Sequence, residues 1–160
     1  MKEKTKQLLV YIAKNYDPIT VTTLMKLSYL IDLTATTRGG DQISTFSYKR
    51  YKFGPFDKKI YTYLNDLVTK QILIEDTTYT TSADEYIQYK FNEENNAKEF
   101  KFDDINTREK KIIDEVLNTL RGCGAKALTL IAYKTKPMKA IGATFGGEEN
   151  LSVALNLKAK

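Results

Sequence analysis

The feature that most constrains this fold is an apolar stretch over residues 24–33, whose hydrophobic side chains point to nearly every side of a helix. They are Leu24, Met25, Leu27, Leu30, Ile31 and Leu33. A helix that is apolar all round is stable in water only when other elements cover it on several sides. Thr20 or Thr22 can cap its first turn. The sequence therefore predicts one central, buried helix with the rest of the domain packed around it.

Further helices are predicted where apolar residues recur at helical spacing. These segments are residues 3–15, 57–70, 106–121 and 126–134. Asp17 precedes a proline, which ends the first of these helices. Asp57 is placed to cap the second, and Asn106 with Glu109 resembles a capping box at the start of the third. We therefore expect most of the chain to be helical.

Strand patterns occupy two shorter parts of the chain. Residues 43–53 alternate between two faces, with an offset near Lys49 and Arg50 that predicts a β-bulge or, alternatively, an irregular loop; Gly54-Pro55 then ends the strand. Residues 72–74 are predicted as a short strand, and residues 77–91 as a hairpin that turns at residues 82–84.

Together these elements predict an α+β fold that is mostly α: a compact helical domain with a small antiparallel sheet or hairpin, in a winged-helix-like order. Residues 1–140 are expected to form a single domain. Residues 141–160 are glycine-rich and weakly patterned, and we expect them to form a mobile C-terminal tail.

Composition excludes several classes of function. The chain has 160 residues and no histidine, which removes Ser–His and Cys–His nucleophile pairs and His-ligated metals. Cys123 is the only cysteine, so an internal disulfide is excluded and a reducing compartment is favoured. No apolar run approaches the roughly 18 residues of a membrane helix. We expect a cytoplasmic, non-enzymatic protein with no cofactor, no metal and no membrane contact.

The net charge of +5 is distributed unevenly along the chain. Residues 1–74 carry a net charge of +6, residues 75–104 a net of −6, and residues 105–160 a net of +5. This pattern is compatible with nucleic-acid binding, and equally with a bipolar protein that docks on an oppositely charged partner.

The segment from residue 48 to residue 59 carries the strongest candidate for a binding surface. Cations alternate there with aromatic rings, which suits phosphates and stacked bases and also suits a protein interface. The alternative is that the rings belong to the core and the cations are their solvated neighbours, because a strand produces that alternation automatically.

Asp32 is unusual because it lies near the end of the helix predicted to be buried. A buried carboxylate needs a cation or several hydrogen-bond donors. The candidate cations are Lys26, Arg50 and Lys52. The alternative is an exposed aspartate on the single polar edge of that helix.

Several of these segments resemble a known family. The stretch Met25–Asp32, which reads Met-Lys-Leu-Ser-Tyr-Leu-Ile-Asp, resembles the helix that opens the Panacea domain of SocA-like antitoxins, and Tyr51–Phe56 resembles that family's Tyr-Gly-Pro-Val element. Ile60, Tyr61 and Leu64 follow as in the family's next helix. The segment 128–138 resembles its last helix, although Tyr133 and Met138 stand where members usually have His and Trp.

The resemblance implies a mostly helical domain and a non-enzymatic activity. Members bind and neutralise diverse toxins, or deliver a toxin to a protease, so we expect direct binding of a partner protein, most simply a toxin. A phage-borne inhibitor of a host protein and a winged-helix DNA-binding regulator are the alternatives. The expected partner-binding residues are Lys49, Arg50, Tyr51, Lys52, Phe53, Lys58 and Lys59. The expected structural motif is Lys26, Tyr29, Asp32, Gly54 and Pro55, with Asp32 anchoring the helix over 57–70.

Overall fold

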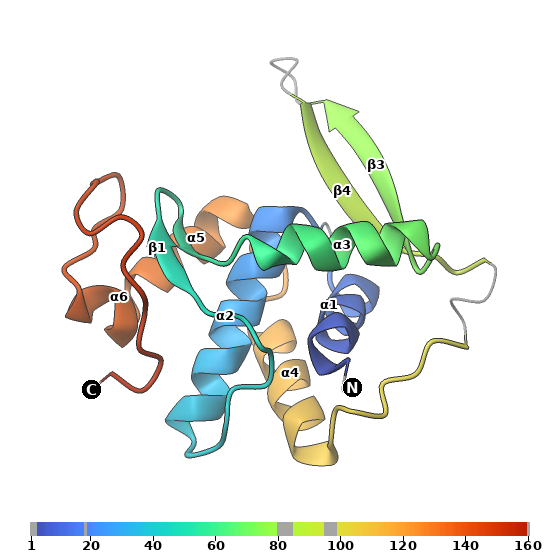
Figure 1. The fold of residues 1–160 in the computed structure, drawn as a ribbon, viewed down its shortest axis with the longest axis horizontal. Coiled ribbons are helices and arrows are strands. Elements are labelled where there is room, and N and C mark those ends of the chain that lie inside the picture. Colours follow the sequence, from blue (N-terminus) through green and yellow to red (C-terminus); the bar gives the residue numbers. More distant parts are fainter. Residues whose placement is uncertain (1–2, 18, 80–84, 95–98, 160) are drawn as a thin grey trace.

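The computed structural model of the chain describes residues 3–159 apart from residue 18 and residues 80–84 and 95–98. Helix α2, Val21–Thr37, runs through the middle of the molecule (Figure 1). Its side chains are buried on nearly all sides, and Leu24, Met25, Leu27 and Ile31 are fully buried. Thr20 caps it, because the Thr20 side chain accepts a hydrogen bond from the Thr23 amide. The prediction of a central buried helix is confirmed.

Three other helices pack directly against α2. They are α1 (Lys4–Asn15), α4 (Thr107–Thr119) and α5 (Ala125–Tyr133). The capping box at the start of α4 is confirmed, since the Asn106 side chain accepts from the Glu109 amide and the Glu109 carboxylate accepts from the Asn106 amide. Helices α3 (Lys59–Thr69) and α6 (Lys136–Ala140) complete the helical part of the described chain.

Two separate two-stranded antiparallel sheets accompany the helices. Strands β3 (Leu73–Tyr79) and β4 (Glu85–Phe91) form a hairpin that projects from the body of the molecule (Figure 1). The turn predicted for this hairpin at residues 82–84 lies outside the described residues. The fold is therefore α+β and mostly α. The sequence predicted the order helix, helix, strand, helix, hairpin, and the structure has a short hairpin in the place of the predicted strand.

The predicted long strand over residues 43–53 with a β-bulge is wrong. Strand β1, Lys49–Tyr51, is short and turns tightly at Lys52-Phe53 into β2, Gly54–Phe56. Tyr51 pairs with Gly54 and Arg50 with Pro55, so the Gly-Pro pair forms the second strand and does not end the first. Gly54 allows this reversal because its φ of +105° is a conformation that other residues rarely adopt.

The C-terminal segment, residues 141–159, lies beside β1 (Figure 1). The Arg50 amide donates to the Val153 carbonyl at 2.9 Å, and the Leu155 amide donates to the Tyr48 carbonyl at 2.9 Å. Leu157 is buried against the main core. None of the helices in the described part of the chain has the length and apolar character needed to cross a bilayer.

Candidate protein-binding site

The buried carboxylate of Asp32 fixes the chain segment that leads into β1. Its Oδ1 atom accepts from the amides of Ile43 and Ser44 at 2.9 and 3.0 Å. Its Oδ2 atom accepts from the hydroxyls of Ser44 and Tyr48 at 2.5 and 2.7 Å. Burial raises the pKa of Asp32, and these hydrogen bonds act in the opposite direction. Asp32 is thus satisfied by four donors.

Two predictions about Asp32 need correction. In the described part of the chain it pairs with none of the proposed cations Lys26, Arg50 and Lys52, because neutral donors from residues 43–48 already fill both oxygens. It also does not anchor the helix over 57–70. The Asp57 amide instead contacts α2, at 3.3 Å from the Met25 Sδ atom, and the Asp57 carboxylate accepts from the Ser47 amide at 2.8 Å and the Lys59 amide at 3.0 Å.

Lys26 joins the central helix to the β1–β2 hairpin. The side chain is only 2% exposed, and its Nζ atom donates to the Pro55 carbonyl at 3.0 Å. The ammonium also lies 5.8 Å from the centre of the Phe56 ring. Burial lowers the pKa of Lys26 to about 8, because an ammonium loses hydration inside the protein. Lys26 therefore holds a charged group beneath the hairpin at neutral pH.

Tyr29 of α2 and Tyr133 of α5 support the same region. The Tyr29 hydroxyl is 2.7 Å from the Thr135 hydroxyl, and its ring packs edge-on against Tyr48. The Tyr133 hydroxyl donates to the Lys52 carbonyl at 3.0 Å, within the hairpin turn. Tyr133 thus holds the hairpin turn in place.

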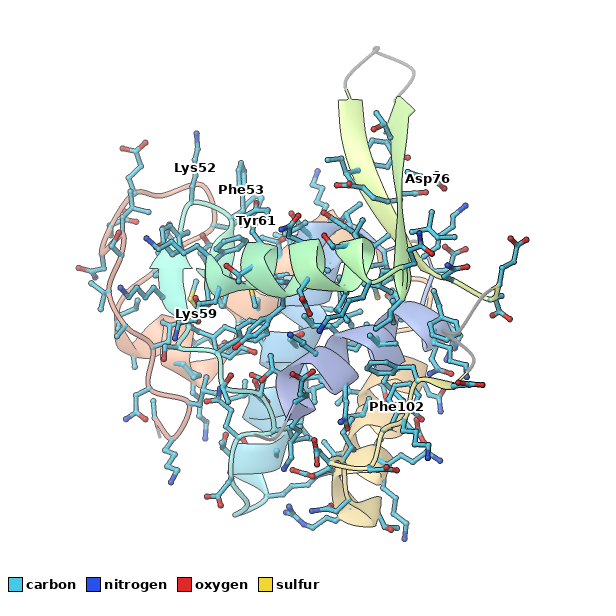
Figure 2. The ribbon with its side chains drawn as sticks, turned by 45° about the vertical axis from the view of Figure 1, so that its right-hand side comes forward. Lys52, Phe53, Lys59, Tyr61, Asp76 and Phe102 are labelled. Carbon is cyan, nitrogen blue, oxygen red and sulfur yellow. The ribbon has the colours of Figure 1, made fainter. Side chains whose placement is uncertain are left out.

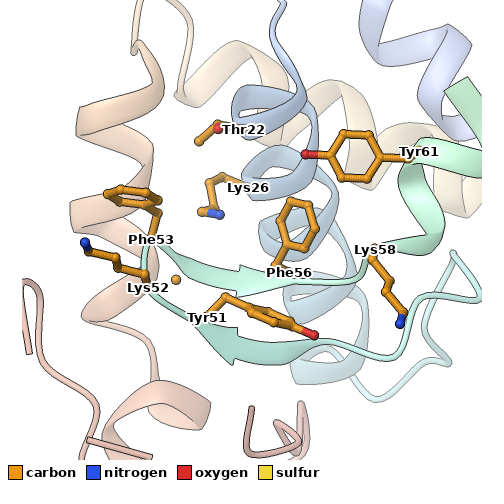
Figure 3. Close-up of a pocket in the computed structure, with 9 residues that line it drawn as sticks. Thr22, Lys26, Tyr51, Lys52, Phe53, Phe56, Lys58 and Tyr61 are labelled. Atoms are coloured by element: carbon orange, nitrogen blue, oxygen red, sulfur yellow. The ribbon is translucent and has the colours of Figure 1, made fainter. Parts of the chain in front are cut away.

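A surface pocket of about 370 Å³ opens above Lys26 (Figure 3). Its walls come from the start of α2, from the hairpin and from the start of α3. The lining residues are Thr22, Lys26, Tyr51, Lys52, Phe53, Gly54, Phe56, Lys58 and Tyr61. Four of them are aromatic and three are lysines, and no Asp or Glu is among those that the structure describes. The pocket therefore combines apolar walls with uncompensated positive charge.

Two rings at this pocket are unusually exposed. Phe53 is 63% exposed and Tyr61 is 54% exposed, although large apolar side chains are normally covered. Figure 2 shows Lys52, Phe53 and Tyr61 close together near one end of α3. The ring of Phe56 lies 5.9 Å from Tyr61 and 5.7 Å from Tyr51, centre to centre, so these three rings form a connected row.

The structure separates the predicted partner-binding residues into three groups. Lys52, Phe53 and Lys58 are exposed and line the pocket, together with the half-buried Tyr51. Lys49 and Lys59 are exposed but lie outside it.

Arg50 does not belong to this surface, because it is fully buried. Its guanidinium donates to the carbonyls of Tyr51, Thr144 and Gly147 at 2.8, 3.0 and 2.8 Å, and it lies 5.3 Å from the Tyr133 ring centre. The side chains of a strand alternate between its faces, so Arg50 points inward where Lys49 points outward. The buried arginine holds the C-terminal segment.

Sequence reasoning missed Thr22 and Tyr61 as pocket residues. Phe56 lies in the candidate segment 48–59 but was not among the expected partner-binding residues. Lys26 was predicted only as part of the structural motif. One local signal was available, since Thr22 and Lys26 are four residues apart and therefore share a helix face. The other positions depend on how the hairpin folds over α2.

These features define a class: a mostly helical α+β domain in which a hairpin held by a buried lysine forms a basic, aromatic surface pocket. The family model for the antitoxin SocA-like Panacea domain matches residues 24–137. The chain belongs to this family, and its role is related to toxin–antitoxin systems. No match was found among curated proteins or among solved structures.

Proposed function

We propose that this chain is a non-enzymatic, antitoxin-like protein that acts in the cytoplasm by binding a partner protein directly. Binding either neutralises the partner, which we take to be a toxin, or delivers it for degradation. Family membership supports the connection to a toxin. The absence of histidine supports a non-enzymatic role, because histidine is the commonest general base in enzymes.

The observation that carries this proposal is the aromatic pocket. Protein interfaces are enriched in aromatic residues at their centres, and complementary charge around them steers association. Phe53 and Tyr61 offer such a centre, while Lys52 and Lys58 provide positive charge at the pocket. None of the three pocket lysines forms an ion pair within the described residues, so their charges are available to a partner.

Co-expression with the product of the neighbouring gene tests the proposal. The neighbour should arrest growth when expressed alone, and growth should return when this chain is co-expressed and copurifies with it. A pulse-chase measurement of the neighbour's half-life separates blocking from delivery to a protease. A neighbour that is harmless alone, combined with copurification of a host protein, would instead identify an inhibitor of that host protein.

Charge reversal locates the interface in the same assay. The pair Lys52→Glu and Lys58→Glu should abolish copurification, because it places two negative charges at the pocket. The pair Lys49→Glu and Lys59→Glu is the matched control, since these exposed lysines lie outside the pocket. Equal binding by both double variants, each with an unchanged melting temperature, would move the interface elsewhere.

A further inference from the structure

The ammonium of Lys26 gives the pocket an incompletely paired charge. An ammonium carries three donor hydrogens. The Pro55 carbonyl takes one, and within the described residues no other hydrogen-bond partner and no carboxylate contacts it. A buried charge without a counter-charge is costly. The desolvation cost of the Lys26 ammonium is already included in the free energy of folding. An anion that pairs with it in the pocket would therefore bind favourably.

The surroundings of Lys26 favour the same kind of ligand. Lys52 and Lys58 add positive charge on either side of the pocket (Figure 3). Thr22 lies in the first turn of α2, where the helix dipole is positive. The rings of Phe53, Phe56 and Tyr61 provide apolar walls next to these charges. A fitting ligand therefore has an anionic group beside an apolar body.

We propose that the pocket receives an acidic side chain of the partner protein, Asp or Glu, with an aromatic side chain next to it in the partner's sequence. This inference rests on the proposed function, because it takes the ligand to be part of a protein. The carboxylate pairs with Lys26, and the adjacent ring packs against Phe53 and Tyr61. Recognition of a chain terminus typically uses a nest of backbone amides. Here the cations that flank the site belong to side chains. This arrangement favours the carboxylate of a side chain within the partner's sequence over a terminal carboxylate.

Short capped peptides test this directly. The probe is acetyl-Phe-Glu-amide, and its matched control is acetyl-Phe-Gln-amide, which differs only in charge. Two further probes are tested in parallel. One is acetyl-Gly-Phe, which has a free terminal carboxylate, and the other is phenyl phosphate. Binding to the full chain is followed by chemical-shift titration at millimolar concentration. We expect the Glu peptide to bind about tenfold more tightly than the Gln peptide, as one additional charged pair predicts.

Three variants assign the contacts. Lys26→Met keeps the apolar stem and should bring the affinity for the Glu peptide down to that for the Gln peptide. Phe53→Ala, at an exposed position, should weaken both peptides equally. Lys58→Glu should weaken the Glu peptide selectively, whereas Lys59→Glu should leave both affinities unchanged. In the wild type, the pKa of Lys26 followed by lysine-selective labelling should rise when the Glu peptide is added.

Clear outcomes would overturn the proposal. Equal affinity for the Glu and Gln peptides, or no binding of either, shows that the pocket does not select an acidic side chain. Tighter binding of the free-carboxylate peptide or of phenyl phosphate identifies a chain terminus or a phosphate as the ligand. If Lys26→Met does not fold, Lys58→Glu and Lys59→Glu still decide the matter. The peptide titration and the growth assay are independent, so failure of one is distinguishable from failure of the other.

Discussion

Lys26 Nζ lies 3.0 Å from the carbonyl oxygen of Pro55, so a buried lysine of the central helix holds the hairpin that carries the pocket. The hairpin must approach α2 closely to make this contact. A Cβ atom at Gly54 would lie 3.2 Å from the Lys26 Cε atom and 3.6 Å from a carbon of the Tyr133 ring. The position of the pocket therefore depends on a glycine next to the proline.

Gly54→Val should lower the melting temperature markedly. The φ of +105° is unfavourable for any residue with a Cβ, and the added side chain meets Lys26. Gly39→Ala is the control, because Gly39 also has a positive φ, but a Cβ there contacts nothing within 4 Å. Thermal unfolding of both variants measures the difference. If the two substitutions lower the melting temperature equally, the contact with Lys26 contributes nothing to the destabilisation.

Asp32→Leu should destabilise the domain by about 3 kcal/mol or more, because four donors lose their acceptor in the interior. Asp32→Asn should cost less, since its oxygen can still accept from the amides of Ile43 and Ser44. Asp41→Asn, at an exposed position, serves as the surface control. Denaturant unfolding gives the three values. An Asp32→Leu variant as stable as the wild type would contradict a structural role for the carboxylate.

The stability of the fold should rise with pH just above neutrality because of Lys26. Burial lowers its pKa from 10.5 to about 8, so the unfolded chain binds more protons than the folded chain between these values. The free energy of unfolding should therefore increase by about 1.5 kcal/mol between pH 8 and about pH 9.5.

The comparison with Lys26→Met isolates this contribution to the pH dependence. The variant should lack the rise, which denaturant unfolding across the pH range will show. Above about pH 10, buried tyrosines such as Tyr29 and Tyr48 act in the opposite direction, because burial raises their pKa values. Identical slopes in the wild type and the variant below that point would rule out a buried charged Lys26.

Arg50→Met should loosen the C-terminal segment, because the carbonyls of Thr144 and Gly147 lose their guanidinium partner. Relative to the wild type, the rate of amide hydrogen exchange should increase more in residues 141–159 than elsewhere in the domain. Arg38→Met is the control, since Arg38 forms an exposed ion pair with Glu115, and such pairs contribute little. Exchange that accelerates equally throughout the chain would argue against a local role for Arg50.

Binding to duplex DNA should be weak, without sequence preference, and lost as salt concentration rises. The exposed lysines at the start of α3 attract phosphates, but the same helix carries Asp66, which pairs with Lys6 at 2.7 Å and Lys70 at 3.1 Å. Mobility-shift assays over a salt series test this. Sequence-specific, submicromolar binding at physiological salt would favour a winged-helix regulator over a protein binder.

Local sequence patterns were enough to predict most of the helices. The apolar residues of α2, the Thr20 cap and the Asn106–Glu109 capping box all involve residues within one or two helical turns of each other. Interactions over such short separations are the same in almost any fold, so the sequence determines them directly.

The errors concern contacts between distant residues. The burial of Asp32 required hydrogen-bond donors or a cation for its carboxylate. Which groups serve as donors depended on residues 43–48 folding back along α2. Arg50 looked like part of a basic surface because its acceptors, Thr144 and Gly147, are more than ninety residues away. Alternation along a strand shows which side chains share a face, but it does not show which face is covered.

The sequence by itself determined most of the residue types of the candidate site: aromatic rings and lysines over residues 48–59, and a lysine on a helix that had to be buried. Only the tertiary structure decided that the hairpin lies over the first turns of α2, so that Lys26 meets Pro55 and faces Phe53 and Tyr61. The physical reason is that a pocket is formed by packing between segments far apart in the chain. Its shape depends on where the hairpin packs on the buried helix. Lys26 and the segment anchored by Asp32 fix that position.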